Sequence, residues 1–315
     1  MMMQYTLSKS VSVSGIGLHS GLAVTMTLNP APVDHGIRFR RTDIIGQTSD
    51  IFAAISSVTS LDRATTLANE LGHSVSTVEH LLAACQGVGL DNVLIEIDGP
   101  EVPIMDGSSL DFCNLFKTGG VTGQSKARNL IRILKPVSVT RGASSAALSP
   151  SADNVLSLAA RIDFEDRAIG TQQASLRLTS GAFCKELSYA RTFARSGELE
   201  GLRKQGLALG GSLDNAILVD GNQIVNPDGL RCADEFVRHK LLDAIGDLAL
   251  AGGTIAGHYE AEQPGHRLNI MLLQRLFATP DAWRWDCMAV GQHAAQLDPA
   301  LATPENHDGG VAASA

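Results

Sequence analysis

The strongest chemical pattern in the sequence lies at residues 238–247, which read Arg-His-Lys-Leu-Leu-Asp-Ala-Ile-Gly-Asp. If this segment is helical, His239 and Asp243 stand four residues apart on one face, and Asp247 extends the same row. The leucines and the isoleucine would pack against a core, where a polar side chain without a partner is costly. Such a row can bind a metal ion. The alternative is a structural hydrogen bond between His239 and Asp243 on a helix surface.

A second pattern, Ser-Thr-Val-Glu-His at residues 76–80, places a glutamate directly before a histidine where a helix is predicted to begin. Glu79 and His80 could both face a reaction site. The same residues fit a capping box, in which a serine caps the helix and a glutamate three residues later bonds back to the serine backbone. Taken alone, Ser76 and Glu79 favour this structural interpretation.

Together, the two segments supply the ligand set of a catalytic zinc ion, which typically has three protein ligands and a fourth position open to water. We expect His80, His239 and Asp243 to bind one Zn²⁺ per chain, although Fe²⁺ would suit the same ligands. Zinc lowers the pKa of bound water toward about 7, while a neighbouring carboxylate accepts the proton. Glu79 is the candidate for that base, and Asp247 could orient an imidazole.

Hydrolysis of an amide also needs an acid that protonates the leaving amine. His266, in the predicted turn Gln-Pro-Gly-His-Arg, is the candidate. Five histidines have no partner pattern and are expected to be surface or packed residues: His35, His73, His258, His293 and His307. His19 lies in a glycine-rich hairpin that could approach a ligand. No helix follows this hairpin, so it is not a dinucleotide-binding fingerprint.

The elements that must position these residues alternate between strands and helices. Residues 5–66 form short runs broken by glycine and proline, which is typical of strands and hairpins. Beyond them, the pattern predicts helices at residues 78–85, 110–116, 234–250 and 268–277, and strands at residues 92–97, 131–139, 155–164 and 254–259. In residues 76–97 and again in 234–259, a helix that carries a histidine is followed by glycines and a strand. This order suggests a duplicated α+β unit.

Composition places the chain among globular proteins. Its 315 residues, 44% of them hydrophobic, are enough for about two domains. The net charge of −8 gives no electrostatic footprint for nucleic acid, so we expect a small-molecule substrate. We also expect a monomer. Five widely spaced cysteines favour a reducing, cytoplasmic setting. We find no signal peptide and no run of about 18 apolar residues, so we expect neither export nor stable membrane insertion.

Seven motifs between residues 5 and 277 occur in a fixed order: Ser-Gly-Ile-Gly-Leu-His-Ser-Gly, Ser-Thr-Val-Glu-His-Leu-Leu-Ala-Ala, Val-Pro-Ile-Met-Asp-Gly-Ser, Ala-Arg-Thr-Phe, Leu-Gly-Gly-Ser, Asp-Glu-Phe-Val-Arg-His-Lys-Leu-Leu-Asp-Ala-Ile-Gly-Asp and Gly-His-Arg-Leu-Asn. In these motifs the chain resembles the UDP-3-O-acyl-N-acetylglucosamine deacetylases, the zinc enzymes of lipid A synthesis in Gram-negative bacteria. The resemblance implies removal of acetate from the 2-amino group of a UDP-sugar that bears a 3-O-hydroxyacyl chain.

The resemblance also implies a role for each candidate residue. The metal and proton-transfer roles would fall to His80, His239 and Asp243 as ligands, Glu79 as base, His266 as acid and Asp247 as the partner of His266. Thr192 would help to hold the oxyanion. The substrate contacts would come from Lys240 at polar or phosphate groups, Phe193 at the sugar, and Asp163 and Phe164 at the uridine.

The fold implied by the resemblance is α+β, with two similar domains that each have a mainly antiparallel sheet and two helices, the helices packed between the sheets. We place the domains at residues 1–124 and 125–280, because residues 119–126 are polar and glycine-rich. A tail, residues 281–315, would be partly disordered.

An insertion at about residues 195–219 would form a hydrophobic tunnel for the acyl chain. Its candidate lining residues are Leu199, Leu202, Leu207, Leu213 and Leu218, for which core packing is the alternative. Two departures from the family pattern affect the substrate contacts. Residues 163–167 read Asp-Phe-Glu-Asp-Arg where the family often has Asp-Phe-x-His-Pro, and Ala208 is small where some relatives carry a bulkier residue. The preferred acyl length therefore stays open.

Two other functions are compatible with the residues. One is a metal hydrolase with the same site and a different acylated substrate. The other is a carbohydrate-binding protein without catalytic activity, in which the row of His239, Asp243 and Asp247 is only structural.

Overall fold

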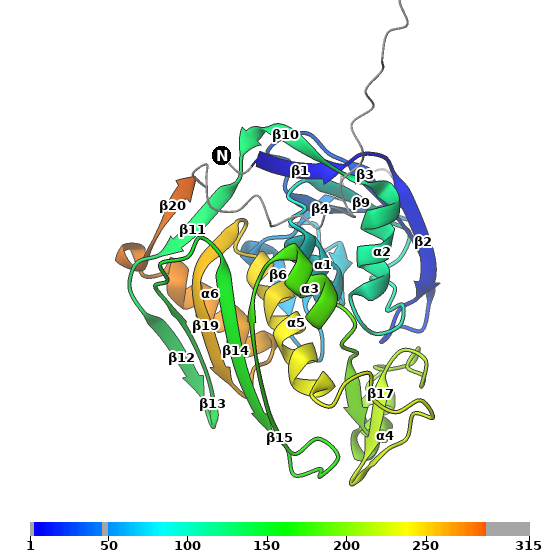
Figure 1. Ribbon diagram of the computed structural model, residues 1–315. Coiled ribbons are helices and arrows are strands. Elements are labelled where there is room, and N and C mark those ends of the chain that lie inside the picture. The colour runs from blue at the N-terminus through cyan, green and yellow to red at the C-terminus, as the bar shows by residue number, and fades with distance from the viewer. Residues whose placement is uncertain (1–2, 46–49, 288–315) are drawn as a thin grey trace, which may run out of the picture.

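The computed structural model describes residues 3–45 and 50–287 and has a mixed α+β architecture (Figure 1). The two largest sheets belong to the first and second halves of the chain, and helices lie between them. One large hydrophobic core runs through both halves, and Leu130 and Ala256 form a small second cluster. The predicted fold class is therefore confirmed. Among the described residues, no helix has the length and apolar character that a membrane crossing requires.

In the first half, five strands form a sheet in the order β2 (Val11–Ile16), β3 (Ala23–Pro30), β9 (Val93–Ile97), β4 (Ile37–Arg41) and β5 (Asp50–Phe52). The central strand β9 follows helix α1 (Glu79–Val88) and precedes helix α2 (Leu110–Gly119). Along β9, Val93, Ile95 and Ile97 are buried, because alternate side chains of a strand point to the same face.

In the second half, the sheet has the order β12 (Val137–Arg141), β13 (Ser144–Ser149), β19 (Thr254–Glu262), β11 (Asn129–Ile133) and β20 (Trp283–Cys287). Strand β19 also pairs with β14 (Leu156–Asp163), and β14 pairs with β15 (Thr171–Arg177). Three helices accompany it: α3 (Ser180–Glu186), α5 (Glu235–Ala249) and α6 (His266–Phe277).

The duplicated order of helix and strand is visible in the topology. After α1, strand β9 runs parallel to β4 and antiparallel to β3. After α5, strand β19 runs parallel to β11 and β14 and antiparallel to β13. The two helices pack against each other at the centre of the molecule (Figure 1). Both contribute fully buried leucines to the core, each of which stabilises the fold by about 1.5–3 kcal/mol.

The predicted insertion forms a small separate unit. It consists of β16 (Phe193–Arg195), α4 (Ser196–Lys204), β17 (Ile217–Asp220) and β18 (Gln223–Ile224). Another small sheet of the first half, next to α1, consists of β6 (Val58–Ser60), β7 (Thr66–Ala68) and β8 (Ser74–Val75). Two single turns of 3-10 helix, η1 (Ile55–Ser57) and η2 (Pro280–Ala282), complete the described elements.

One detail of the sequence interpretation needs correction. The polar, glycine-rich stretch at residues 119–126, which suggested the domain boundary, is mostly regular structure, because it contributes to strand β10 (Val121–Ala127), which pairs with β1 (Met3–Leu7). The domain boundary at residue 124 would fall inside β10 and stays a prediction. The first residues of the predicted tail form β20, which pairs with β11, and this is compatible with a tail that is only partly disordered. The rest of the tail, with His293 and His307, lies outside the described residues.

Candidate metal centre and active site

Two helices bring the three predicted metal ligands together. His80 lies in the first turn of α1, and His239 and Asp243 lie one turn apart on α5. The Nε2 atoms of His80 and His239 are 3.5 and 3.3 Å from Oδ1 of Asp243. One potential ligand atom from each residue lies within 4.8 Å of the others, and all three residues are buried.

The chemistry of this group fits a metal ion. Oδ1 of Asp243 is buried without a hydrogen-bond partner, which is costly unless a cation compensates the charge. Nδ1 of His239 lies 3.0 Å from the carbonyl oxygen of Ala190. An Nδ1–H that donates there leaves the Nε2 lone pair facing Asp243. Burial lowers the pKa of His239 to about 3, so the imidazole is neutral, as a metal ligand must be.

Asp243 is anionic in this setting. Burial by itself favours the protonated acid, but the interactions with His239 and Lys240 hold the pKa of Asp243 well below its usual value. The ammonium group of Lys240 donates to Oδ2 of Asp243 at 3.0 Å. Each oxygen of this carboxylate therefore has a different role, with Oδ2 bonded to Lys240 and Oδ1 turned toward the two histidines.

Gly246 allows α1 and α5 to approach closely enough to build the site. A Cβ atom at this position would lie 2.0 Å from the backbone oxygen of Glu79. Such a distance is far inside van der Waals contact, so only glycine fits without moving a helix. This contact places the first turn of α1 against the part of α5 that carries Asp243 and Asp247.

The carboxylate of Glu79 faces the candidate acid. Its Oε2 accepts a hydrogen bond from the backbone N–H of Thr65 at 3.1 Å, and its Oε1 lies 3.6 Å from Nε2 of His266. Burial raises the pKa of Glu79, and the nearby His266 opposes this effect. A carboxylate in such a setting is a stronger base than one in water.

The capping-box interpretation of residues 76–80 is wrong. Helix α1 is preceded by Val78, and no side chain caps it. The backbone N–H of Ser76 bonds to Pro100 instead of to Glu79. The carboxylate of Glu79 is therefore available for the site.

His266 is held by Asp247, as the family resemblance implies. Its Nδ1 lies 2.9 Å from Oδ2 of Asp247. Burial by itself would lower the pKa of His266, but the charges of Asp247 and Glu79 outweigh burial and raise it to about 10. The imidazole is therefore protonated at neutral pH and can donate a proton from Nε2, the atom that faces Glu79.

Two residues of this network were missed from the sequence. The hydroxyl of Thr65 donates to Oδ1 of Asp247 at 2.7 Å, and the amide of Asn269 donates to Oδ2 at 2.8 Å. Asn269 follows His266 by three residues on α6, so helical spacing could have indicated it. Thr65 has no such signal, because it lies 182 residues from its partner Asp247.

Phe193 and Lys240 lie beside the metal ligands. Nζ of Lys240 is 5.3 Å from the centre of the Phe193 ring, and this ring meets the imidazole of His239 at 6.4 Å. The backbone N–H of Thr192 donates to Gly107 at 2.8 Å, and its half-buried side chain lines a cavity together with Phe193. The three predicted residues thus border one region next to the metal centre.

The two residues predicted to meet the uridine lie at the end of β14. Phe164 contacts Phe193 edge to face, with ring centres 5.8 Å apart. Asp163 is exposed and accepts a hydrogen bond from the Thr171 hydroxyl at 2.6 Å. Asp166, in the part of this segment that departs from the family pattern, lies 3.4 Å from a guanidinium nitrogen of Arg195.

The insertion surrounds an apolar cavity of about 220 Å³. Four of the five candidate leucines line it, namely Leu199, Leu202, Leu213 and Leu218, whereas Leu207 lines a neighbouring open cleft of about 880 Å³ that contains His266. Their role in binding an acyl chain stays a prediction. His19 and Arg63 border both spaces. The cavity thus adjoins the cleft at His19 and Arg63.

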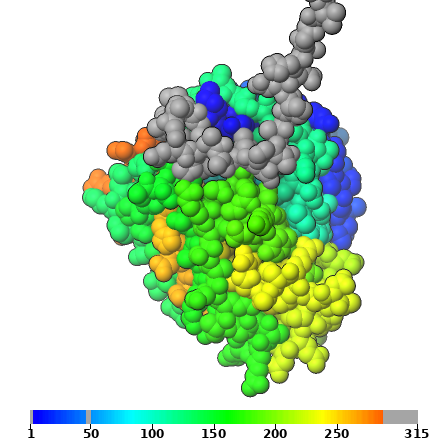
Figure 2. All heavy atoms as spheres, viewed as in Figure 1, coloured from blue at the N-terminus to red at the C-terminus, as the bar shows by residue number. Residues whose placement is uncertain are grey.

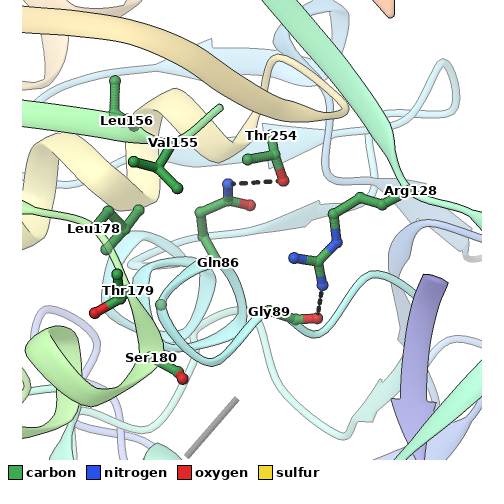
Figure 3. A pocket seen from close by; sticks show the side chains of 10 residues that line it. Gln86, Gly89, Arg128, Val155, Leu156, Leu178, Thr179, Ser180 and Thr254 are labelled. Atoms are coloured by element: carbon green, nitrogen blue, oxygen red, sulfur yellow. Dashed lines mark hydrogen bonds between the residues drawn. The ribbon is translucent and has the colours of Figure 1, made fainter. Parts of the chain in front are cut away.

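A third cavity lies beyond the other end of α1 and is lined by residues from both halves (Figure 3). The amide of Gln86 donates to the Thr254 hydroxyl at 3.5 Å, and Arg128 donates to the carbonyl of Gly89. Its volume of about 20 Å³ has room for about one water molecule. This cavity belongs to the contact between the halves and is too small for a sugar substrate.

Comparison with known proteins agrees with this geometry. The family model of LpxC, UDP-3-O-acyl N-acetylglycosamine deacetylase, matches residues 4–278. A UDP-3-O-acyl-N-acetylglucosamine deacetylase from Idiomarina loihiensis is 48% identical over 90% of this chain and 93% of its own length. Proteins of the same name from Phenylobacterium zucineum and Myxococcus xanthus are 44% and 48% identical, over 90% and 89% of this chain and 96% and 88% of their own lengths. The chain therefore belongs to the family of UDP-3-O-acyl-N-acetylglucosamine deacetylases, which are metalloenzymes.

Proposed function

We propose that this protein is the deacetylase of lipid A biosynthesis that removes acetate from UDP-3-O-(hydroxyacyl)-N-acetylglucosamine. The observation that carries the proposal is the buried group of His80, His239 and Asp243 beside the pair Glu79 and His266. Membership of the deacetylase family supports the choice of substrate.

The three ligands would hold one Zn²⁺ per chain. Two imidazoles and one carboxylate match the ligand sets of catalytic zinc sites, and Fe²⁺ would suit the same atoms. When bound, such an ion lowers the pKa of water and polarises the carbonyl group of the substrate.

Glu79 is the base in this proposal, and His266 is the acid. Because Oε2 of Glu79 is bonded to the Thr65 backbone, Oε1 is the oxygen that takes the proton from the attacking water. His266 then donates the proton on Nε2 to the amide nitrogen as the carbon–nitrogen bond breaks, and the sugar leaves with a free amine. Asp247 holds Nδ1 of His266 and keeps the ring protonated and oriented.

Other residues would bind the substrate. Thr192 borders the site from the cavity side, where a donor can stabilise the developing oxyanion. Lys240 and Phe193 would contact the sugar and its polar groups, and Asp163 and Phe164 would contact the uridine. The cavity of about 220 Å³, lined by Leu199, Leu202 and Leu213, would take part of the acyl chain.

The decisive experiment measures acetate release from the acylated UDP-sugar by metal-reconstituted protein. We expect turnover of this substrate and little hydrolysis of a simple acetamide. Equal hydrolysis of both would favour a different acylated substrate. Metal analysis after dialysis tests the site itself, since fewer than about one ion per chain, with no loss of activity on His80→Ala or Asp243→Ala, would exclude a catalytic metal ion at these residues.

The protein is further proposed to be a cytoplasmic monomer. Cys85, Cys113 and Cys232 form no disulfide bond, which suits a reducing compartment. Light scattering of the purified protein should give a mass near 33.2 kDa.

A further inference from the structure

A hairpin of the first half binds the insertion of the second half. The hairpin comprises residues 17–22, and the bound segment of the insertion comprises residues 208–211. The backbone N–H of Leu209 donates to the carbonyl of His19 at 3.2 Å, and the N–H of Gly210 donates to the carbonyl of Leu18 at 3.0 Å. We call these two segments the clasp. In the space-filling view the insertion, in yellow-green, lies next to the teal and blue atoms of the first half (Figure 2).

The clasp is a backbone-to-backbone contact that leaves no space for a side chain. A Cβ atom at Gly210 would lie 2.2 Å from the backbone oxygen of Gly17. The ring of His19 also takes part, since its Nδ1 accepts a hydrogen bond from the N–H of Ala208 at 3.3 Å. Because His19 and Ala208 both line the acyl cavity, the clasp forms part of the cavity wall.

A buried carboxylate holds the hairpin side of the clasp. Glu101 is 1% exposed. Its Oε1 accepts a hydrogen bond from the N–H of His19, and its Oε2 accepts one from the N–H of Ser20, both at 2.8 Å. Backbone N–H groups bonded to an ionised acceptor make strong hydrogen bonds, so this carboxylate fixes the conformation of the hairpin.

The same carboxylate reaches the start of the catalytic helix. The hydroxyl of Thr77 donates to Oε1 of Glu101 at 2.8 Å. Thr77 has a φ of 55°, in the left-handed region that a β-branched residue rarely adopts. The bond to Glu101 helps to hold this strained turn, and the chain enters α1 two residues later at Glu79 and His80.

We propose that Glu101 is a positioning residue that sets the wall of the acyl cavity relative to Glu79 and His80. The proposal rests on the function proposed above. A long acyl chain in the cavity then holds the amide at the correct distance from the base and the metal ligands. Displacement of a substrate by about 1 Å can cost about 100-fold in rate, so a small shift of the clasp has a large effect.

The test compares two UDP-sugars, one with a long 3-O-hydroxyacyl chain and one with a 3-O-acetyl group. Glu101→Gln keeps the shape of the side chain but turns an amide NH₂ toward one of its N–H donors. We expect the ratio of kcat/KM for the long over the short substrate to fall by about 10-fold or more. A purely structural role would lower both values equally, and an unchanged ratio would overturn the proposal.

Two further variants complete the test. Gly210→Ala strains the clasp from the side of the insertion and should lower the same ratio, which keeps the proposal testable if Glu101→Gln does not fold. The control is Asp91→Asn, which removes a carboxylate that bonds Tyr5 and Arg128 beyond the other end of α1. This control should reduce stability and leave the ratio unchanged.

Binding distinguishes failure of this inference from failure of the proposed function. Calorimetry on metal-free protein gives the ratio of the two association constants, for the long over the short substrate, without any turnover. The ratio should fall in Glu101→Gln and Gly210→Ala whether or not wild-type protein releases acetate. Loss of acetate release in wild-type protein would contradict the proposed function alone, and an unchanged binding ratio would contradict the role of Glu101.

Discussion

The backbone oxygen of Glu79 lies where a side chain at Gly246 would begin, 2.0 Å from the position of its Cβ atom. This contact lies between α1 and α5, beside the residues of the site. It brings the base and a histidine from one helix to the histidine and aspartate of the other. The geometry of the metal centre therefore depends on a residue that has no side chain.

Replacing Gly246 by alanine should push the helices apart. In an ordinary helix interior this change stabilises by up to about 1 kcal/mol, but overpacking here should destabilise by about 1–3 kcal/mol or more. We also expect kcat/KM to fall by about 100-fold. Gly201→Ala in α4 is the matched control, because a Cβ atom there meets nothing within 4 Å. Urea unfolding and acetate release measure both effects, and equal stability of the two variants would contradict the close contact.

Replacing Glu79 by glutamine should abolish proton transfer and keep the metal site. An amide oxygen can still accept the bond from the Thr65 backbone, but it cannot take a proton from water. We expect kcat to fall by about 10²–10⁴-fold, with metal content unchanged by elemental analysis. Glu260→Gln, at an exposed carboxylate on β19, should leave kcat unchanged. Activity close to wild type in Glu79→Gln would show that another group is the base.

Replacing Asp247 by asparagine should move the alkaline limb of the pH profile to lower pH. Asp247 is the leading cause that raises the pKa of His266 from 6.5 to about 10. The contribution of protonated His266 to the stability of the folded state is complete below pH 6.5 and is lost as pH rises toward 10. Without the charge of Asp247 the pKa of His266 falls, so His266 loses its proton, and the enzyme its acid, at a lower pH. The profile of kcat/KM against pH tests this, and an unmoved alkaline limb would assign the limb to a different group.

Removing the metal should lower thermal stability. Asp243 is buried, anionic and has one oxygen without a hydrogen-bond partner, so a cation that binds only the folded state stabilises it. A ligand at 1,000 times its Kd contributes about 4 kcal/mol, which corresponds to roughly 10 °C in a chain of this size. Calorimetry with chelator and then with added Zn²⁺ should show a reversible shift in Tm. Asp243→Ala should show no shift, and a similar shift in this variant would place the ion elsewhere.

Breaking a buried ion pair should weaken both stability and metal binding. Glu235, at the start of α5, is fully buried and bonds the Arg191 guanidinium at 2.9 Å. This pair fixes the segment whose Ala190 carbonyl faces His239. Glu235→Gln should destabilise by about 3–5 kcal/mol and raise the Kd for Zn²⁺. The half-exposed pair Arg161 and Glu262 is the control, and Glu262→Gln should cost at most about 1 kcal/mol in urea unfolding.

The sequence determined the chemistry of the individual segments. His239 and Asp243 share a helix face because a helix repeats every 3.6 residues, and the structure confirms that spacing. Local periodicity also indicated the helices around Glu79 and His266 and the order of helix and strand in both halves. Motif order indicated the family, which the comparisons confirm.

Only the tertiary structure decided which segments meet. By sequence, Ser76 and Glu79 fit a capping box as well as Glu79 fits a reaction site. The hydrogen bonds of Thr65 to Glu79 and of Ser76 to Pro100 exclude the capping box. Thr65 and Asp247 are 182 residues apart, and no local pattern records such a pair. The polar, glycine-rich composition of residues 119–126 suggested a domain boundary. The strand in this segment pairs with the N-terminal strand, and such a distant contact leaves no trace in the local composition. Hydrophobic periodicity specifies which face of an element is buried, whereas the packing of α1 on α5 specifies what that face touches.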